Sequence, residues 1–174
     1  IGKDCLIGPN TYIMDGTVGN GVTLDNVKLT DSTVEDGADA GPFVQIRGGG
    51  VLHTGVHIGD FVEVKNSTVG AGTKSAHLTY IGDSDVGAGV NFGCGTVTVN
   101  YDGKNKSRCK IGDGAFIGCN TNLVAPVEVG DRAYIAAGST ITDDIPGDAL
   151  SIARARQVNK PGWVTEKKPY KEKK

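Results

Sequence analysis

The sequence has few aromatic residues and no strong charge of either sign. Phe, Trp and Tyr make up only 6% of the 174 residues, which is too little bulky material for the core of an ordinary β-sandwich. The formal net charge is −2 at pH 7. This value argues against a general nucleic-acid or membrane-surface binder, because both need a strong cationic field to collect phosphates. Only the tail, residues 167–174, is basic, and we interpret it as a solvated terminus.

Closely spaced cysteines and long apolar runs are also absent. The four cysteines lack the paired spacing of zinc ligands, and a chain of this length does not need disulfides; they are Cys5, Cys94, Cys109 and Cys119. No apolar run approaches the ~20 residues of a membrane span, and no signal peptide opens the chain. We therefore expect reduced thiols in a cytoplasmic protein. Because the opening IGKDCLIG already lies inside a repeat, we also expect the chain to be a fragment.

Aliphatic residues recur at every sixth position in the second half of the chain: Ile111, Ile117, Leu123, Val129, Ile135 and Ile141. Two positions before each of them stands a small residue: Cys109, Ala115, Thr121, Val127, Ala133 and Ser139. Side chains two apart on extended backbone share a face, so each hexapeptide forms a short strand with two inward positions. Glycine, present 27 times, permits the turns between strands. This period is the signature of a parallel β-helix, whose stacked coils bury a continuous column of aliphatic side chains.

The same phase extends to most of the chain, at Ile1, Ile7, Ile13, Ile46, Leu52, Ile58 and Val64. It slips by one residue near Val69 and Val86. Coils stack ~4.8 Å apart, so we expect one prism a few tens of ångströms long.

Two segments depart from the period. The polar, turn-rich stretch VNYDGKNKSRC predicts a loop projecting from one coil over about residues 99–110. From Pro146 onward the period is lost, and the pattern offers at most a short helix around residues 148–156, followed by an arm. The predicted organisation is therefore a β-helix over residues 1–145, then a C-terminal helix, arm and basic tail over residues 146–174.

Four stretches carry a resemblance to a known family: IGDFVEVK (58–65), KSAHLTYIGD (74–83), NFGCGTVTVNYDGKNK (91–106) and LVAPVEVGDRAYIAAGSTIT (123–142). Together they resemble the C-terminal acetyltransferase domain of the bifunctional bacterial enzymes that combine glucosamine-1-phosphate acetyltransferase with N-acetylglucosamine-1-phosphate uridyltransferase, in the hexapeptide-repeat superfamily. The resemblance implies an all-β, left-handed parallel β-helix; the spacing itself does not show the handedness. It also implies a homotrimer with active sites between subunits.

The resemblance further implies an activity. Acetyl-CoA would serve as co-substrate for N-acetylation of glucosamine-1-phosphate, a step in the biosynthesis of UDP-N-acetylglucosamine. The family's N-terminal nucleotidyltransferase domain has no counterpart in the sequence, so we expect Mg²⁺ only in that missing domain and no metal site in this chain.

The central candidate is His77, in the stretch SAHLTYIGDS. Acetyl transfer from a thioester to an amine needs a general base, and histidine titrates near neutral pH. A lone histidine in an arbitrary sequence is more often a packed corner residue, but the surrounding motif favours the base. The backbone amide of Cys94 corresponds to the family's oxyanion donor, a role that does not depend on the side chain.

The remaining site residues follow from the resemblance. Those assigned to the sugar phosphate are Arg47, Lys65, Tyr80, Asn91 and Lys106, with Glu63 as a weaker candidate. Those assigned to acetyl-CoA are Cys94, Asn100, Tyr101, Cys119, Ala137 and Arg154. Two positions depart from the family pattern. Cys119 stands where serine is expected, and Gly48 where proline follows the arginine, so we expect a weaker cofactor contact and a looser turn at Arg47.

Three alternatives stay open. The first is a related acyltransferase acting on a nucleotide sugar or on serine. The second is a carbonic anhydrase, which needs three histidine ligands; His53 and His57 are four apart on a six-residue repeat and should not share a face with His77. The third is a non-catalytic solenoid scaffold, for which TVTVN is the only trace of an outward ladder of similar residues.

Overall fold

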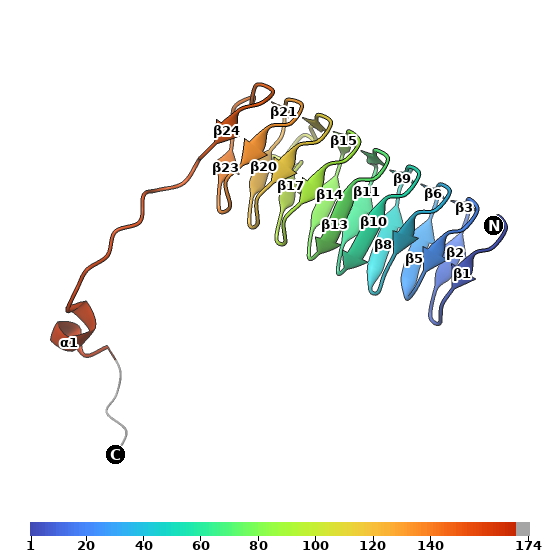
Figure 1. Cartoon of the computed structure of the whole chain (residues 1–174), viewed down its shortest axis with the longest axis horizontal. Helices are drawn as coiled ribbons and strands as arrows, with labels where there is room; N and C mark the ends of the chain where they lie inside the picture. The colour runs from blue at the N-terminus through green and yellow to red at the C-terminus, as the bar shows by residue number, and fades with distance from the viewer. Residues whose placement is uncertain (170–174) are drawn as a thin grey trace, which may run out of the picture.

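A computed structural model describes residues 1–169 and shows a straight prism with a trailing C-terminal arm (Figure 1). Within the described residues the strands form three parallel sheets, which we call A, B and C. Sheet A consists, in order, of β1 (Leu6–Ile7), β4 (Thr23–Leu24), β7 (Asp39–Ala40), β10 (His57–Asp60), β13 (Lys74–His77), β16 (Asn91–Phe92), β19 (Phe116–Ile117), β22 (Tyr134–Ile135) and β24 (Leu150–Ser151).

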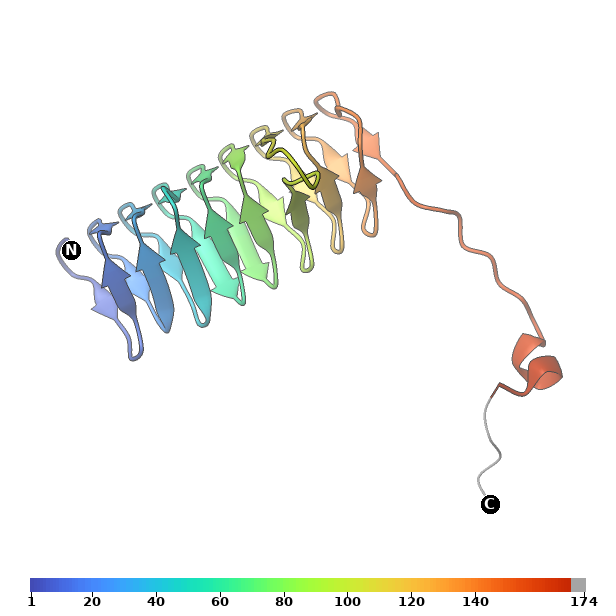
Figure 2. The same ribbon diagram turned by 180° about the vertical axis from the view of Figure 1, so that it is seen from behind.

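Sheet B consists of β2 (Tyr12–Met14), β5 (Val27–Thr30), β8 (Val44–Arg47), β11 (Glu63–Lys65), β14 (Tyr80–Gly82), β17 (Val97–Val99), β20 (Asn122–Val124) and β23 (Thr140–Ile141). Sheet C consists of β3 (Thr17–Val18), β6 (Thr33–Val34), β9 (Val51–Leu52), β12 (Thr68–Val69), β15 (Ser84–Val86), β18 (Cys109–Ile111) and β21 (Val127–Val129). The chain visits A, B and C in turn, and each strand pairs with the equivalent strand of the next coil. The fold is thus the predicted all-β parallel β-helix, in the arrangement of the left-handed hexapeptide-repeat prisms (Figure 2).

The predicted inward positions form the core. The six aliphatic positions from Ile111 to Ile141 and the six small positions before them are all buried. A fully buried leucine or isoleucine side chain contributes roughly 1.5–3 kcal/mol, so the stacked column supplies most of the stability. Burial also raises the pKa of the Cys109 thiol to about 11. At the N-terminal end Ile1 and Ile7 occupy inward positions but are exposed, because no earlier coil covers them in the structure.

The predicted slip of the period changes what fills one core position. Ala40 pairs with Ile58, and Ile58 pairs with Ser75, so the later coil is one residue shorter than the one before it. Val69 and Val86 are in register and both stay buried. Ser75 occupies a position that is hydrophobic in the neighbouring coils, as Ile58 and Phe92, and its buried hydroxyl has no hydrogen-bond partner in the described part of the chain.

The projecting loop is confirmed. Residues 100–108 leave the prism between β17 and β18, closed by a bridge between Tyr101 and Lys106 (Figure 2). Its start follows the buried Thr98 and its end precedes the buried Cys109. The excursion therefore interrupts one corner of a coil and leaves the core column intact.

The predicted helix around residues 148–156 is wrong. Leu150 and Ser151 form β24, which pairs with β22 at the edge of sheet A. That open edge offers backbone partners, so Ala136 N–H donates to the Ser151 carbonyl (2.9 Å) and an extended strand is favoured over a helix. Strand pairing thus continues beyond residue 145, the expected boundary of the β-helix domain. The helix of the arm is α1 (Trp163–Lys167).

Residues 170–174 of the basic tail lie outside the described residues. Among residues 1–169, no helix combines the length and the apolar character that crossing a bilayer requires.

Candidate active site

Four predicted residues stack at the corner between sheets A and B. His77 ends β13, and Cys94, Cys119 and Ala137 take the equivalent place in the next three coils; we call these four the corner column. Backbone hydrogen bonds join successive corners: Gly95 N–H to Leu78 O (2.9 Å), Asn120 N–H to Cys94 O (2.8 Å) and Gly138 N–H to Cys119 O (2.8 Å). The fold therefore aligns the expected base, oxyanion donor and two cofactor contacts along one edge of the prism.

His77 presents a free imidazole. The residue is exposed, and its ring has no hydrogen-bond or ion-pair partner among the described residues. Its backbone is fixed, because the Thr79 hydroxyl donates to the His77 carbonyl (2.7 Å) and the next residue, Leu78, has φ 37°. A held backbone with an uncommitted ring is suited to accepting a proton from a bound substrate.

The backbone N–H of Cys94 is also uncommitted. It makes no hydrogen bond within residues 1–169, whereas the neighbouring N–H groups of Gly93 and Gly95 both donate to carbonyls of adjacent coils. A free N–H on a fixed turn can receive the oxygen of a reacting carbonyl.

The predicted cations lie on the outer face of sheet B. Arg47 and Lys65 are register neighbours on β8 and β11, and Gly82 follows them on β14. Arg47 donates to Glu63 Oε1 from Nε (2.7 Å), and its Nη2 lies 2.7 Å from the same oxygen. Glu63 thus orients Arg47, and Gly48, with φ 61°, adopts a turn that proline could not.

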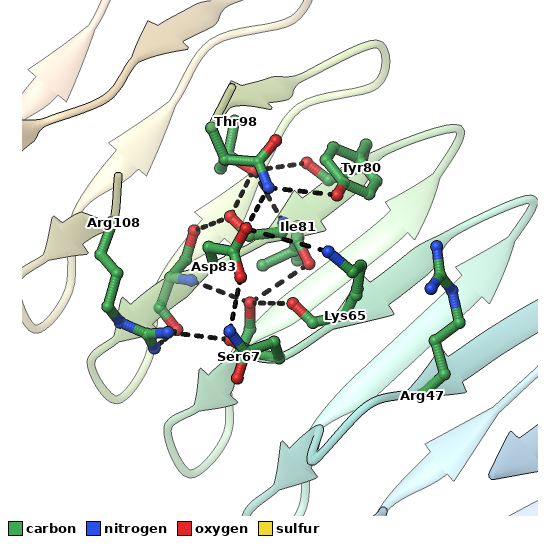
Figure 3. A network of polar contacts seen from close by, with 12 residues as sticks. Arg47, Lys65, Ser67, Tyr80, Ile81, Asp83, Thr98 and Arg108 are labelled. Atoms are coloured by element: carbon green, nitrogen blue, oxygen red, sulfur yellow. Dashed lines mark hydrogen bonds and ion pairs between the residues drawn. The ribbon is translucent and has the colours of Figure 1, made fainter. Parts of the chain in front are cut away.

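Tyr80 folds over the neighbouring glycine. A methyl group added at Gly82 would come within 2.3 Å of the Tyr80 hydroxyl oxygen, so the ring covers the space that a side chain would occupy. Because Gly82 has no side chain, the Tyr80 ring can lie over it, and the phenol then lies next to Lys65, the register partner of Gly82 (Figure 3).

A buried carboxylate that the sequence did not indicate lies behind the cations. Asp83 is 4% exposed and accepts hydrogen bonds from the side-chain amides of Asn66 (2.5 Å) and Asn100, and Lys65 Nζ lies 3.9 Å from its Oδ2 (Figure 3). Burial alone would raise the pKa of Asp83. The two amide donors and the charges of Lys65 and Lys106 outweigh burial and lower that pKa below its ordinary value.

The projecting loop meets this group from the side of the next coil. Asn100 Nδ2 lies 3.4 Å from the Tyr80 hydroxyl oxygen, and the charge of Lys106 is among the causes that lower the pKa of Asp83. Arg108 closes the loop by donating to Asp85 and to the carbonyls of Asn66 (3.0 Å) and Ser84 (3.1 Å). Tyr101 is exposed on the loop, with its hydroxyl donating to the Gly103 carbonyl (2.6 Å).

Two predicted residues lie apart from the sheet B group. Asn91 opens β16 on sheet A, in register with Lys74, which lies at the other end of β13 from His77. Arg154 lies beyond β24, and its Cδ would be 3.6 Å from a methyl group at Gly138, beside the corner column. Asn91 thus does not meet the sugar-phosphate candidates within this chain, whereas Arg154 extends the corner column.

The two other histidines bind carboxylates elsewhere. Nδ1 of His53 lies 3.0 Å from Glu35 Oε1, and Nδ1 of His57 lies 2.6 Å from Asp39 Oδ1. His57 is in register with Lys74, at the start of the strand that His77 ends. The three histidines therefore do not share one site.

Comparison with known proteins agrees with the geometry. Two hexapeptide families match the sequence: "Bacterial transferase hexapeptide (six repeats)" over residues 108–143 and "Hexapeptide repeat of succinyl-transferase" over residues 1–26. The bifunctional protein GlmU of Geobacillus sp. is 60% identical over 164 residues, covering 94% of this chain and 36% of the relative. The GlmU of Clostridium kluyveri is 56% identical over 167 residues, covering 96% and 37%.

The chain is a hexapeptide-repeat protein of the GlmU family. It spans little more than a third of the length of these GlmU relatives. A solved structure with the same fold is a perosamine N-acetyltransferase from Caulobacter crescentus in complex with CoA and GDP-perosamine, with a TM-score of 0.51 and 20% identity over 70% of this chain and 53% of that one. The GlmU relatives thus identify the family, and the solved structure shows the shared fold.

Proposed function

We propose that this chain transfers an acetyl group from acetyl-CoA to the amine of glucosamine-1-phosphate. One observation carries the proposal. Arg47 and Lys65 lie side by side on the outer face of sheet B, with the Tyr80 hydroxyl next to them. His77 ends the strand that precedes the strand of Tyr80 in the same coil. Cations for a phosphate and a base for an amine therefore lie on adjoining surfaces.

The reaction balances with groups of this chain. The sugar amine attacks the thioester carbonyl carbon, His77 takes the proton that the amine loses, and the carbon–sulfur bond breaks to release the CoA thiolate, which then gains a proton. The Cys94 N–H stabilises the oxygen that becomes negative during attack. A thioester is reactive enough that no covalent enzyme intermediate is needed.

The phosphate would bind to the cations of sheet B and the loop. Arg47 keeps donors beyond those given to Glu63 and can grip phosphate oxygens in pairs, while Lys65 and Lys106 act as point charges. Acetyl-CoA would lie along the corner column, with Asn100 and Tyr101 on one side and Arg154 at the far end. Cys119 is exposed in that column and offers no hydroxyl, so we expect no strong hydrogen bond there.

The assembly we propose is a homotrimer with sites between protomers. Phe43 and Phe61 stack with their ring centroids 5.1 Å apart, and Leu78 follows His77 at the same corner; all three are more than half exposed. We call them the corner ridge. Covering this apolar ridge with another protomer would bring that protomer up to His77. The product would feed UDP-N-acetylglucosamine synthesis in the cytoplasm, and uridyl transfer with Mg²⁺ would belong to the part of the GlmU relatives that this chain does not span.

The test is a comparison of two acceptors. Release of CoA thiol is measured with acetyl-CoA and either glucosamine-1-phosphate or glucosamine. Because hydrogen bonds to charged groups contribute about 1.5–3 kcal/mol each, we expect kcat/KM to favour the phosphate by at least about 10–100-fold. Equal rates with the two acceptors, or transfer only to a nucleotide sugar or serine, would contradict the proposal. An absence of transfer to any acceptor would point to the scaffold alternative.

A further inference from the structure

Asp83 is a buried aspartate at the corner between sheets B and C. Asn66, Asp83 and Asn100 stand at this corner in three successive coils, and the carboxylate of the middle residue accepts from the amides above and below it. Asp15 and Asp31 take the same corner in earlier coils and are exposed. Only at Asp83, among these three aspartates, do neighbouring side chains and the loop close over the carboxylate.

Both ends of the projecting loop converge on this residue. The loop begins at Asn100, whose amide donates to the Asp83 carboxylate, and it ends at Cys109, whose N–H donates to the Asp83 carbonyl (3.1 Å). The Asp83 N–H in turn donates to the Lys65 carbonyl (3.0 Å). One residue thus connects the strand that bears Lys65 with both ends of the loop that bears Lys106.

The charge of Asp83 suits this role better than direct contact with substrate. Its oxygens are buried and already accept amide donors, so it does not present a free carboxylate to an incoming phosphate. Its negative charge instead offsets the repulsion between Lys65 and Lys106, which would otherwise drive the two ammonium groups apart. Because this carboxylate is buried, losing its two hydrogen bonds from the asparagine amides or the nearby lysine would leave it unpaired, which costs free energy of folding.

We propose that Asp83 is a positioning residue: it holds Lys65 directly, and through Asn100 at the start of the loop it holds Lys106, so that both cations face the phosphate of the sugar substrate. This inference rests on the proposed function, which it deepens by assigning the source of phosphate selectivity. Asp83 acts through the cations and does not touch the reacting atoms.

The first experiment uses Asp83→Asn, which keeps the size of the side chain but removes the charge. The new amide then faces the amides of Asn66 and Asn100 in place of a carboxylate that accepts from both. We expect kcat/KM for glucosamine-1-phosphate to fall about 10–100-fold while kcat/KM for glucosamine stays near the wild-type value. A purely structural role would lower both acceptors together. The matched control is Asp36→Asn, because Asp36 also accepts from an asparagine of a neighbouring coil, Asn20 (2.6 Å to its N–H), far from the cations; it should change neither value.

A second experiment reads the loop without using activity. Trypsin cleavage after the exposed residues Lys104 and Lys106 should accelerate in Asp83→Asn and not in Asp36→Asn. The double variant Asp83→Asn, Asn100→Asp restores a carboxylate–amide pair with its members exchanged, and it should recover the slow cleavage. If Asp83→Asn does not fold, Asn100→Ala removes the loop-side partner alone and should show the same faster cleavage.

These outcomes separate the two proposals. Wild-type protein with no transfer to either acceptor would defeat the proposed function, and cleavage would then decide on Asp83 alone. Unchanged cleavage in both Asp83→Asn and Asn100→Ala would overturn the positioning role. An active Asp83→Asn that keeps the wild-type preference for the phosphorylated acceptor, or one that loses both acceptors equally, would overturn it as well.

Discussion

In the proposed reaction the chemistry depends on the imidazole of His77. Its ring is exposed and has no partner among the described residues, so replacing His77 with Ala removes no hydrogen bond or ion pair from the fold. We predict that His77→Ala lowers kcat about 10²–10⁴-fold, the usual contribution of a general base, and leaves the melting temperature and both KM values close to wild type. Steady-state kinetics and calorimetry check this. His57→Ala is the control, since that histidine pairs with Asp39 elsewhere, and a His77→Ala variant with most of its activity would rule out the base.

At the residue scale, the sequence named the candidate residues at the corner, whose chemistry stays a prediction, but it missed the carboxylate of Asp83 behind the cations. The tripeptide Ile-Gly-Asp occurs at residues 58–60, 81–83 and 111–113. In the structure these copies lie at the ends of strands of sheets A, B and C respectively. The three aspartates therefore lie at three different corners, and only Asp83 is buried. No local signal distinguishes them, because the difference comes from the asparagines of the neighbouring coils and from the loop that covers one corner.

Strand β14 illustrates how elements position the site, and it allows a paired test. A methyl group at Gly82 would meet the Tyr80 ring, whereas one at Gly59 on β10 would lie 2.0 Å from the Ala76 carbonyl oxygen of the next coil. A ring can swing away, but a paired backbone cannot move without breaking the ladder. We predict that Gly59→Ala is destabilised by more than about 2 kcal/mol or fails to fold, as for a severe steric clash.

The companion variant, Gly82→Ala, should fold with a melting temperature near wild type. Its displaced Tyr80 should raise KM for glucosamine-1-phosphate severalfold while KM for acetyl-CoA changes little. Thermal unfolding and kinetics on the two variants check the pair. Similar stability for both variants, or an unaltered KM in Gly82→Ala, would show that the two glycines do not play these separate roles.

Elements were predictable where the repeat is regular and less so where it stops. The inward positions, the slip and the loop at 99–110 follow from a six-residue period that needs no knowledge of distant contacts. The helix expected around residues 148–156 failed for a tertiary reason. Residues Leu150 and Ser151 form the edge strand of sheet A by pairing with β22. The hydrogen bonds of this pairing override a weak local preference for helix.

On the scale of the whole molecule, the arrangement of one prism does not complete the site. Asn91 lies on sheet A at the opposite end of the strands from His77, on a different face from Arg47 and Lys65, so a single chain cannot bring all the expected substrate contacts together. The corner ridge of Phe43, Phe61 and Leu78 is exposed beside His77. Both features are accounted for if a second protomer packs on that ridge and contributes its own Asn91, a relation between copies that the six-residue period alone does not specify.

Shared sites between protomers predict complementation. His77→Ala and Asn91→Ala homotrimers should each be poorly active, because every site carries one lesion. If His77 and Asn91 of a site come from different protomers, an equal mixture of the two chains, unfolded and reassembled together, places both intact residues in about a quarter of the sites of a cyclic trimer. The rate of the mixture should then approach a quarter of the wild-type rate, with light scattering confirming the trimer. If the two residues come from the same protomer, every site keeps one lesion, and the mixture stays at the mean of its parents.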